Sequence, residues 1–388
     1  MTVIFVVSTT ILLTQLTTTR TKSPKSRPGQ LQTSSPTKDG STSQQPPQGY
    51  LVYVCDWGQA CGGWGDRHRA IVNVYMLAYL THRHFRLVMT SPCDVTRFYV
   101  PHRVDWRVKG RELEVGGDDD QVTFNLRSLF NIFLTKSFHD SLRSGDFNAK
   151  HPQRVVYFKG NHVFYDSIKS NSFYKAKLKR WKSYAEMFKW AWGQLMQPSQ
   201  ELVERLEAHV GPEILVRRGL ISKSVLPPSA NYSHSQPTDS PLICAHVRVG
   251  KNPNNPKDIK LPRFSASDLP LLINFLKEKD VHGDARFFIA SDSEEIRAKF
   301  RHPLGSSRML EAVGRISHID LDRHEAGACE GLGVALLEQL VLSVCDQLVV
   351  TPSGYSFYAA LVSNSSVPPV RLYGGKLEAD VRQRSWPL

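Results

Sequence analysis

Residues 241–251 read PLICAHVRVGK, an apolar run that ends on His246, Arg248 and Lys251. Such a run is typical of a buried strand. In open α/β sheets ligands bind beyond the carboxyl ends of the strands, and the planar guanidinium group of arginine can bind a phosphate through two hydrogen bonds. The stretch therefore predicts a parallel sheet with an anionic ligand at its edge. For an isolated His-x-Arg, a strand edge with solvated charges would be the simpler interpretation.

Helices and strands alternate through the C-terminal third of the chain. Strands that alternate with helices of this length form parallel βαβ units. We therefore predict a doubly wound nucleotide-binding domain over residues 241–388. The pattern predicts helices over residues 268–279, 291–301, 330–344 and 355–362, and strands over residues 286–290, 315–319, 347–351 and 370–373.

The turn Thr351-Pro-Ser-Gly leads from one of these strands into a helix. The N-terminus of a helix offers backbone N–H groups to an anion. An ordinary serine-capped helix is the alternative interpretation of a single turn of this kind. The turn is predicted to follow a strand of the same sheet as the strand that carries Arg248, and this favours a ligand site.

A glycine-rich turn connects a predicted strand at residues 51–55 to a predicted helix at residues 67–80. Its glycines match neither GxGxxG nor the phosphate loop of ATP-binding proteins. Glycine allows close approach of the backbone to a ligand. We therefore expect substrate contacts from Gly63, Gly65 and Arg67.

Length and charge limit the domain count and the class of ligand. A chain of 388 residues exceeds what one core usually serves, which predicts two domains. We assign residues 49–221 to an N-terminal Rossmann-like domain and residues 222–240, rich in Pro and Ser, to a linker. The net charge of +13 favours anionic ligands, such as nucleotide-sugars, sulfated glycans or nucleic acid.

The first 48 residues do not read as a globular domain. Residues 1–18 contain an apolar run that fits a signal sequence or a shortened signal-anchor. Residues 19–48 are rich in Ser, Thr, Pro and Gln and are predicted to be a disordered stem. A hydrophobic start, a stem and a globular body are the layout of an enzyme of the Golgi or ER lumen, held by a type II membrane anchor, or of a secreted one.

Six cysteines and two N-glycosylation sequons, at Asn231 and Asn364, fit such a compartment. No cysteine spacing resembles a zinc site. A disulfide between Cys55 and Cys61, or between one of these and Cys93, is expected, whereas Cys244 and Cys345 fit either a disulfide or free core thiols.

Four motifs together resemble the superfamily of fucosyltransferases that use GDP-fucose, which includes α1,6-fucosyltransferases, protein O-fucosyltransferases and bacterial nodulation enzymes. The resemblance implies an α/β fold of the GT-B type, in which two Rossmann-like doubly wound domains face each other across a cleft. It also implies that GDP-fucose is held mainly by the C-terminal domain, without a metal or other cofactor. The motifs are GGWGDR at 62–67, HVRVGK at 246–251, IASDSEEIRAKF at 289–300 and VVTPSGYSFYAALV at 349–362.

The resemblance also implies roles for individual residues. Arg248 matches the arginine that contacts the β-phosphate and helps GDP to leave, and His246 matches the histidine near the nucleotide and the sugar. Asp292 matches the acidic position after the second strand of that domain. The segment that holds the diphosphate is matched by Ser353, Gly354, Ser356 and Phe357.

The catalytic base is where the sequence departs from the family pattern. The α1,6 enzymes carry carboxylates shortly after the arginine, whereas no carboxylate lies between Arg248 and Asp258 here. Asp258 or Asp66 is therefore the candidate base, although Asp66 also fits an ordinary N-cap. We expect transfer of fucose from GDP-fucose to a glycan or protein hydroxyl, with inversion.

Three alternatives stay open. A binding module that holds a nucleotide or glycan without turnover fits the missing carboxylate. A binder of heparin or nucleic acid fits the charge, although the scattered basic residues argue against nucleic acid as a partner. The triplet Asp118-Asp119-Asp120 resembles the acidic motif of metal-dependent glycosyltransferases, but a solvated acidic turn is the favoured interpretation.

Overall fold

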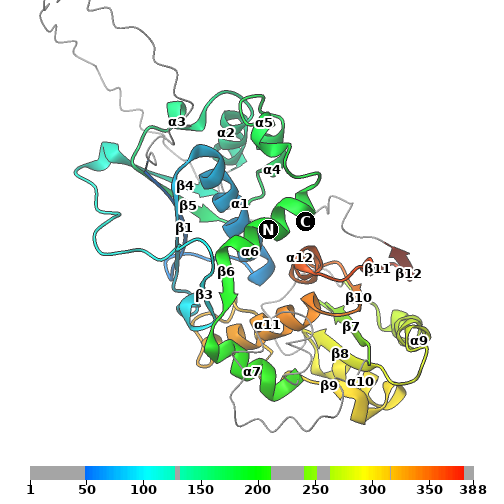
Figure 1. Cartoon of the computed structure of the whole chain (residues 1–388). Coiled ribbons are helices and arrows are strands. Elements are labelled where there is room, and N and C mark those ends of the chain that lie inside the picture. The colour runs from blue at the N-terminus through cyan, green and yellow to red at the C-terminus, as the bar shows by residue number, and fades with distance from the viewer. Residues whose placement is uncertain (1–48, 127–131, 211–239, 251–262, 315, 380–388) are drawn as a thin grey trace, which may run out of the picture. The chain divides into compact units, whose positions relative to one another are not determined.

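The computed structural model describes residues 49–126, 132–210, 240–250, 263–314 and 316–379. All of these described residues belong to one compact unit, and Figure 1 shows its elements along the chain. The predicted leader at 1–18, the stem at 19–48 and nearly all of the linker at 222–240 lie outside the described residues. In the described ranges no helix is long and apolar enough to cross a membrane.

The N-terminal half is built on a four-stranded sheet in the order β2-β1-β5-β4, in which every pair of neighbours is parallel. Strand β1 is almost completely buried, as is typical of strands in parallel sheets. Helix α1 (Trp64–Thr81) follows it and packs against the sheet. The strands are β1 (Tyr50–Cys55), β2 (His84–Met89), β4 (Gln121–Leu126) and β5 (Val155–Gly160).

The two faces of this sheet are covered differently. Leu51, Tyr53 and Cys55 belong to the same buried cluster as α1. On the other face, Val52 and Val54 contact a loop that contributes apolar side chains. The further elements of this half are α2 (Ile132–Leu142), α3 (Phe147–Lys150), α4 (Tyr165–Lys169), α5 (Lys175–Leu178), α6 (Tyr184–Leu195), α7 (Gln200–Val210), the short strand pair β3 (Tyr99–Pro101) and β6 (Met196–Pro198), and the 3-10 turns Val95–Arg97 and Asp118–Asp120.

The C-terminal half contains a six-stranded sheet in the order β12-β11-β10-β7-β8-β9. All neighbours are parallel except the last pair, β11 and β12. Along the chain the strands β7, β8 and β9 run to one side, and β10 and β11 start again on the other side of β7. The strand order therefore reverses between β7 and β10. The strands are β7 (Leu242–Val247), β8 (Arg286–Ser291), β9 (Met309–Leu310), β10 (Gln347–Val350), β11 (Val370–Tyr373) and β12 (Lys376–Ala379).

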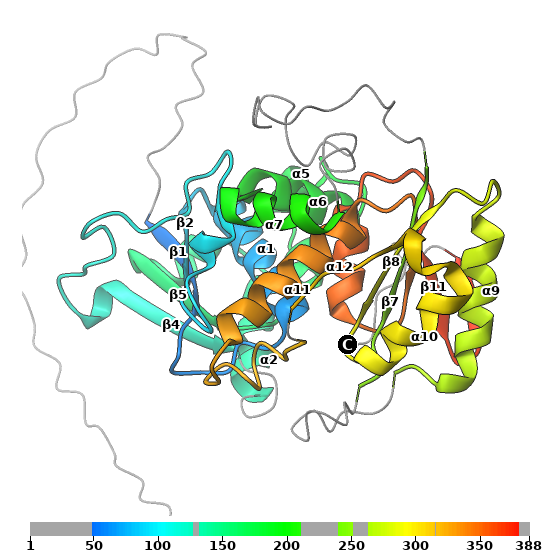
Figure 2. The ribbon, with the colours of Figure 1, turned by 90° about the horizontal axis from the view of Figure 1, so that it is seen from below.

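Helices cover both faces of this sheet (Figure 2). Because side chains alternate along a strand, Ile243, Ala245 and Val247 of β7 join the core beneath α9 and α10, whereas Leu242 and Cys244 join the core beneath α11 and α12. His246 has the parity of the second set. The helices are α9 (Leu269–Lys279), α10 (Glu294–Leu304), α11 (Ala328–Ser343) and α12 (Gly354–Val362), with 3-10 turns at Ala266–Asp268 and Ser306–Arg308.

The strand predicted at 315–319 is wrong. The edge strand next to β8 is β9, and residues 316–319 form no strand. Here the Asp322 carboxylate accepts hydrogen bonds from the backbone N–H of His318 at 2.9 Å and from the hydroxyl of Ser317 at 3.1 Å. Local bonds of this kind compete with a sheet ladder for the backbone. The other strands and helices predicted for this half are present within a few residues of their expected bounds.

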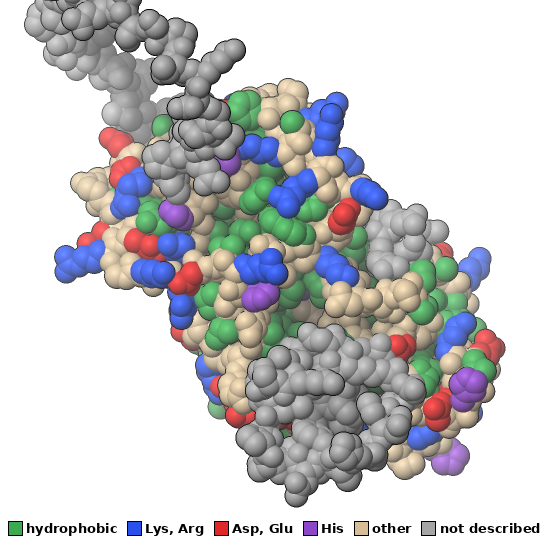
Figure 3. Space-filling model, viewed as in Figure 1, with side chains coloured by type: hydrophobic (Ala, Val, Ile, Leu, Met, Phe, Trp, Pro, Cys, Tyr) green, Lys and Arg blue, Asp and Glu red, His purple; other side chains and the backbone are tan. Residues whose placement is uncertain are grey.

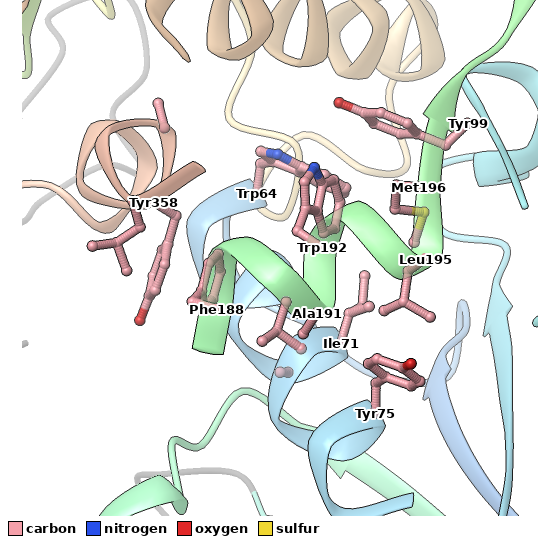
Figure 4. Packing of buried hydrophobic residues seen from close by; sticks show 14 of the residues in the cluster. Trp64, Ile71, Tyr75, Tyr99, Phe188, Ala191, Trp192, Leu195, Met196 and Tyr358 are labelled. Atoms are coloured by element: carbon pink, nitrogen blue, oxygen red, sulfur yellow. The ribbon is translucent and has the colours of Figure 1, made fainter. Parts of the chain in front are cut away.

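The two halves share one core. Helix α12 of the C-terminal half packs against α1 and α6 of the N-terminal half. Figure 4 shows the aromatic side chains at this contact, where the ring of Tyr358 stacks on that of Phe188 at a centroid distance of 4.8 Å. Phe188 and Trp192 of α6 are both buried in this core.

All six cysteines form disulfide bonds. Cys55 is bonded to Cys61, as expected, and Cys244 is bonded to Cys345, which decides between the two options left open for this pair. The third bond joins Cys93 to Cys329, 236 positions apart, and so connects the two halves covalently. Three disulfides fit a lumenal or secreted protein.

Candidate functional site

The carboxyl ends of β7 and β10 meet where the strand order of the C-terminal sheet reverses. Such a reversal is where open α/β sheets bind ligands. The backbone N–H of Arg248 donates to the hydroxyl of Thr351 at 2.8 Å, and the backbone N–H of Thr351 donates to the carbonyl of His246 at 3.1 Å. The two stretches predicted from the sequence, HVRVGK and TPSGYSFY, are therefore brought together.

Asp292 organises the turn that follows β7. Its carboxylate accepts hydrogen bonds from the backbone N–H groups of Val249, at 2.7 Å, and Gly250, at 3.0 Å. It also lies 2.7 Å from the guanidinium of Arg248, and both side chains are largely buried. Because one carboxylate holds both the backbone and the guanidinium, Asp292 fixes the direction in which Arg248 points.

His246 is buried at the same place, with 5% of its surface exposed. Its Nδ1 atom lies 2.8 Å from the Oγ atom of Ser356, and its ring lies 5.0 Å from that of Tyr355. Burial, reinforced by three neighbouring arginines, lowers the pKa of His246 to about 3. The imidazole is therefore neutral near pH 7. The arginines are Arg248, Arg297 and Arg263, in order of effect.

Arg263, which no sequence motif indicates, also belongs to the site. Its guanidinium donates to the carbonyl of Pro352 at 2.9 Å, and its backbone N–H donates to the carbonyl of Val249 at 2.9 Å. Arg263 thus connects both stretches of the site. Its position just before a predicted helix gave no sign that it would return to the strand ends. With Arg248 it brings two guanidinium groups to the site, of which Arg248 is paired with Asp292, and positive charge suits an anion.

The first turn of α12 borders the site. Ser353 is the N-cap, and its hydroxyl accepts a hydrogen bond from the backbone N–H of Tyr355 at 3.3 Å. Ser356 is fully buried and contacts His246, while Phe357 is buried in the core. Ser353 thus caps the helix beside the end of β10, and it is as buried as Phe357, each side chain being 6% exposed.

A buried ion pair, which no sequence motif indicates, joins α11 to α10 beside the site. The Glu338 carboxylate lies 2.5 Å from the guanidinium of Arg297, which also donates to the carbonyl of Ser291 at 2.9 Å. Burial raises the pKa of Glu338 to about 7, although Arg297 opposes the shift. A carboxyl group with such a pKa beside a predicted ligand site is a marker of function. Glu338 lies among apolar residues in the sequence of α11, and this pattern gives no sign of an ion pair.

Gly65 and Gly354 lie in contact where α1 and α12 begin. A Cβ atom on Gly65 would come within 2.5 Å of the carbonyl carbon of Gly354 and of the backbone nitrogen of Tyr355. These glycines thus allow the two halves to approach closely. Gly63 is different, since a Cβ added there would meet no atom within 4 Å.

Asp66 completes the start of α1. Its carboxylate accepts a hydrogen bond from the backbone N–H of Gly63 at 3.1 Å and lies 2.9 Å from the guanidinium of Arg69. These contacts are those of the helix-capping alternative. The side chain is nevertheless 31% exposed, so its carboxylate is accessible.

Arg67 has no exposed surface. It donates to the carbonyl of Gly62 at 2.9 Å and to that of Ile319 at 3.5 Å, and it lies 3.7 Å from the Asp320 carboxylate. It also donates to the carbonyl of Ser91. Since these acceptors come from both halves, the contacts of Arg67 hold the halves together.

The sequence also pointed to Asp258 and to the acidic triplet Asp118–Asp120. Asp258, like Lys251, lies outside the described residues. The triplet Asp118–Asp120 comes just before β4, at the amino end of a parallel strand and so at the opposite edge of the N-terminal sheet from Cys55. Asp120 contacts Arg154 there, and the triplet is a largely exposed turn, as favoured from the sequence. Among the described side chains no cluster of three or more His, Cys, Asp or Glu residues has the geometry to hold a metal ion.

No protein-family model and no curated protein sequence matches the chain. Solved structures do match. FUT1 from Arabidopsis thaliana, solved as a mutant in complex with GDP, has a TM-score of 0.55 at 13% identity, over 87% of this chain and 74% of its own. The fucosyltransferase NodZ from Bradyrhizobium has a TM-score of 0.53 at 12% identity, over 85% and 98%. NodZ α-1,6-fucosyltransferase soaked with GDP-fucose has a TM-score of 0.51 at 12% identity, over 85% and 98%.

The NodZ neighbours are fucosyltransferases, the activity that the sequence motifs predict. At this identity the likeness concerns the fold. The chain thus has the predicted GT-B-like α/β fold with two Rossmann-like halves.

Proposed function

We propose that the protein transfers fucose from GDP-fucose to a hydroxyl of a glycan or protein, with inversion and without a metal. The observation that carries this proposal is the convergence of Arg248, Arg263 and the N-terminus of α12 at the strand reversal of the C-terminal sheet. Fixed cations and helix-terminal donors are suited to a diphosphate that gains charge as it leaves. One structural neighbour is a complex with GDP and another was soaked with GDP-fucose, which supports the same donor.

In the reaction, the oxygen of the acceptor hydroxyl attacks C1 of fucose on the face opposite GDP. The new C1–O bond forms as the bond from C1 to the β-phosphate oxygen breaks, which inverts the configuration at C1. Arg248, held in direction by Asp292, stabilises the charge that develops on the leaving diphosphate. His246 is neutral and contributes hydrogen bonding near the sugar and the phosphate.

The proton of the acceptor hydroxyl goes to a carboxylate. Of the two candidates, Asp66 is partly exposed at the start of α1, near the contact of the two halves. Asp258 follows Arg248 in the chain, at the spacing nearest to that of the family base. We assign the base to one of these two, and the substrate contacts to Gly63, Ser353 and the first turn of α12.

We also propose that the protein works in the Golgi or ER lumen, or is secreted, and that residues 1–18 act as a leader or type II anchor. A non-catalytic binding module of the same fold is the second candidate, because no carboxylate follows Arg248 before Asp258. A polyanion binder is disfavoured, since Figure 3 shows Lys and Arg dispersed over that face of the described surface, several beside acidic residues.

Thermal unfolding with GDP, GDP-fucose or UDP-sugars, each with and without Mn²⁺, tests the donor site. A ligand that binds only the folded state raises its stability. We expect GDP and GDP-fucose to raise Tm without metal, and Arg248→Ala to abolish the increase. Arg301→Ala, which removes an exposed arginine of α10, is the matched control and should leave the increase unchanged. Stabilisation by UDP-sugars with Mn²⁺ alone would contradict the proposal, and fucose transfer by the purified protein separates an enzyme from a binding module.

A further inference from the structure

Trp57 is an exposed tryptophan at the contact of the two halves. Its side chain lies in the turn between β1 and α1 and is 45% exposed. Every other tryptophan among the described residues is buried or partly buried. Its ring centroid is 5.4 Å from that of His324, which belongs to the loop before α11. This turn and this loop lie side by side at the lower left of Figure 2. The two rings, one from each half, form an aromatic pair that we call the Trp57–His324 platform.

The turn that carries Trp57 is held rigidly although the indole is not buried. The Cys55–Cys61 disulfide closes it, and the backbone N–H of Gly58 donates to the Asp56 carboxylate at 3.0 Å. The backbone N–H of Cys61 donates to Asp320 of the other half at 2.8 Å. A rigid aromatic side chain loses little conformational entropy when a ligand covers it. Trp57 therefore offers a fixed aromatic surface that a ligand could cover at little entropic cost.

The residue before Trp57 in the chain, Asp56, is part of a polar pair. Asp56 follows β1, and its carboxylate lies 3.1 Å from the ammonium group of Lys159 at the end of β5. Both side chains are about one-third exposed, at 34% and 32%. Strands β1 and β5 are parallel neighbours, so this pair lies at the carboxyl ends of two adjacent strands, the edge at which open α/β sheets bind their ligands.

We propose that the Trp57–His324 platform and the Asp56–Lys159 pair bind a neutral saccharide ring of the acceptor. A pyranose has an apolar face of C–H groups and an edge of hydroxyls, which matches an aromatic surface beside a hydrogen-bond donor and acceptor. Because Asp56 balances the charge of Lys159, the pair suits hydroxyl groups better than an anion. Calling this saccharide the acceptor rests on the proposed function. The binding of a saccharide to the platform is a separate claim that does not depend on it.

Fluorine NMR of the whole chain labelled with 5-fluorotryptophan tests the proposal in the absence of nucleotide. The Trp57 signal is assigned by its loss in Trp57→Phe. The probes are lactose, cellobiose and N,N′-diacetylchitobiose, with sorbitol as a polyol without a ring face and pyrophosphate as an anion. We expect a saturable shift of the Trp57 signal with at least one disaccharide and none with sorbitol or pyrophosphate.

The affinity for that disaccharide, measured by calorimetry, should fall roughly tenfold in Trp57→Ala and a few-fold in His324→Ala. Phe173→Ala removes another exposed aromatic side chain, 56% exposed and far along the chain, and is the matched control, with no expected change. No shift with any disaccharide, or equal affinity in Trp57→Ala, would overturn the proposal. The increase in Tm with GDP tests the donor site separately. Saccharide binding without fucose transfer would therefore reject the proposed function and leave the saccharide site standing.

Discussion

The Nδ1 atom of His246 lies 2.8 Å from the Oγ atom of Ser356, a residue 110 positions further along the chain. This contact joins the end of β7 to the first turn of α12 across the strand reversal. Because the pKa of His246 is lowered to about 3, the imidazole contributes hydrogen bonding without charge. The positive charge at the site therefore comes from the arginines, whose charge does not change with pH in the physiological range.

Asp292→Asn should weaken nucleotide binding indirectly, because Asp292 holds the side chain of Arg248. The carboxylate pairs with Arg248 and accepts hydrogen bonds from two backbone N–H groups. The amide keeps its shape but loses the negative charge and one of the two acceptor oxygens. We expect the affinity for GDP to fall by about tenfold, which corresponds to ~1.4 kcal/mol. Calorimetric titration with GDP measures this. Glu311→Gln, which removes the partner of the surface residue Arg301, is the control, and equal losses in both variants would reject the role of Asp292.

Gly65→Ala should destabilise the protein by about 2 kcal/mol or more. The added Cβ would overlap the backbone of Gly354 and Tyr355, which cannot move without separating α12 from α1. Gly193→Ala is the matched control, because Gly193 also lies within a helix and a Cβ there would meet no atom within 4 Å. We expect this control to be neutral or to stabilise by up to ~1 kcal/mol. Guanidinium unfolding of both variants compares them, and similar free energies of unfolding would contradict the close contact.

His68 should make the protein less stable in mildly acidic solution. Burial among aromatic rings lowers its pKa to about 3, from an ordinary value of about 6.5. The unfolded chain thus takes up a proton below pH 6.5 that the folded chain excludes, so stability falls as the pH falls toward 3. Between pH 7.5 and 5.5 the loss from this one residue is about 1.4 kcal/mol.

His68→Phe keeps the aromatic packing and removes the titration. The free energy of unfolding of this variant, measured at pH 7.5 and 5.5, should change by about 1.4 kcal/mol less than that of the natural chain. An unchanged pH dependence would show that His68 is not excluded from protonation in the folded state.

Glu338 should have the opposite pH dependence. Its folded-state pKa, about 7, lies above the ordinary value, so the folded chain keeps a proton that the unfolded chain releases. The stability contributed by this protonation is present at low pH and is lost as the pH rises from about 4.5 through 7. We expect Glu338→Gln to gain stability relative to the natural chain between pH 5 and pH 8, by ~1–3 kcal/mol. Thermal unfolding over this range measures the difference, which should stay flat for Glu311→Gln.

The sequence predicted the parts of the site that depend on local pattern. An apolar strand that ends on His246 and Arg248 and a serine-capped helix after β10 follow from periodicity and capping, and the fold places them together. Arg263 and Glu338 could not be found in this way. Each reaches the site through a tertiary contact, and neither spacing nor composition encodes such a contact.

The pairing of Cys93 with Cys329 and the edge strand β9 were beyond prediction for related reasons. A disulfide between distant positions depends on how the two halves pack, and six cysteines allow many pairings. The apolar pattern near Ile319 resembles a strand, but the side-chain bonds of Asp322 hold the backbone in a turn. Local hydrogen bonding by Asp and Ser decided the structure there.

The Cys93–Cys329 bond also decides what a protease can release. A single backbone cut anywhere between these two cysteines leaves both fragments joined by sulfur. Nicked protein therefore migrates as one species in a denaturing gel and separates into two bands only after reduction. Truncated forms that end before Cys329 would instead leave Cys93 with an unpaired thiol, available to couple with another molecule.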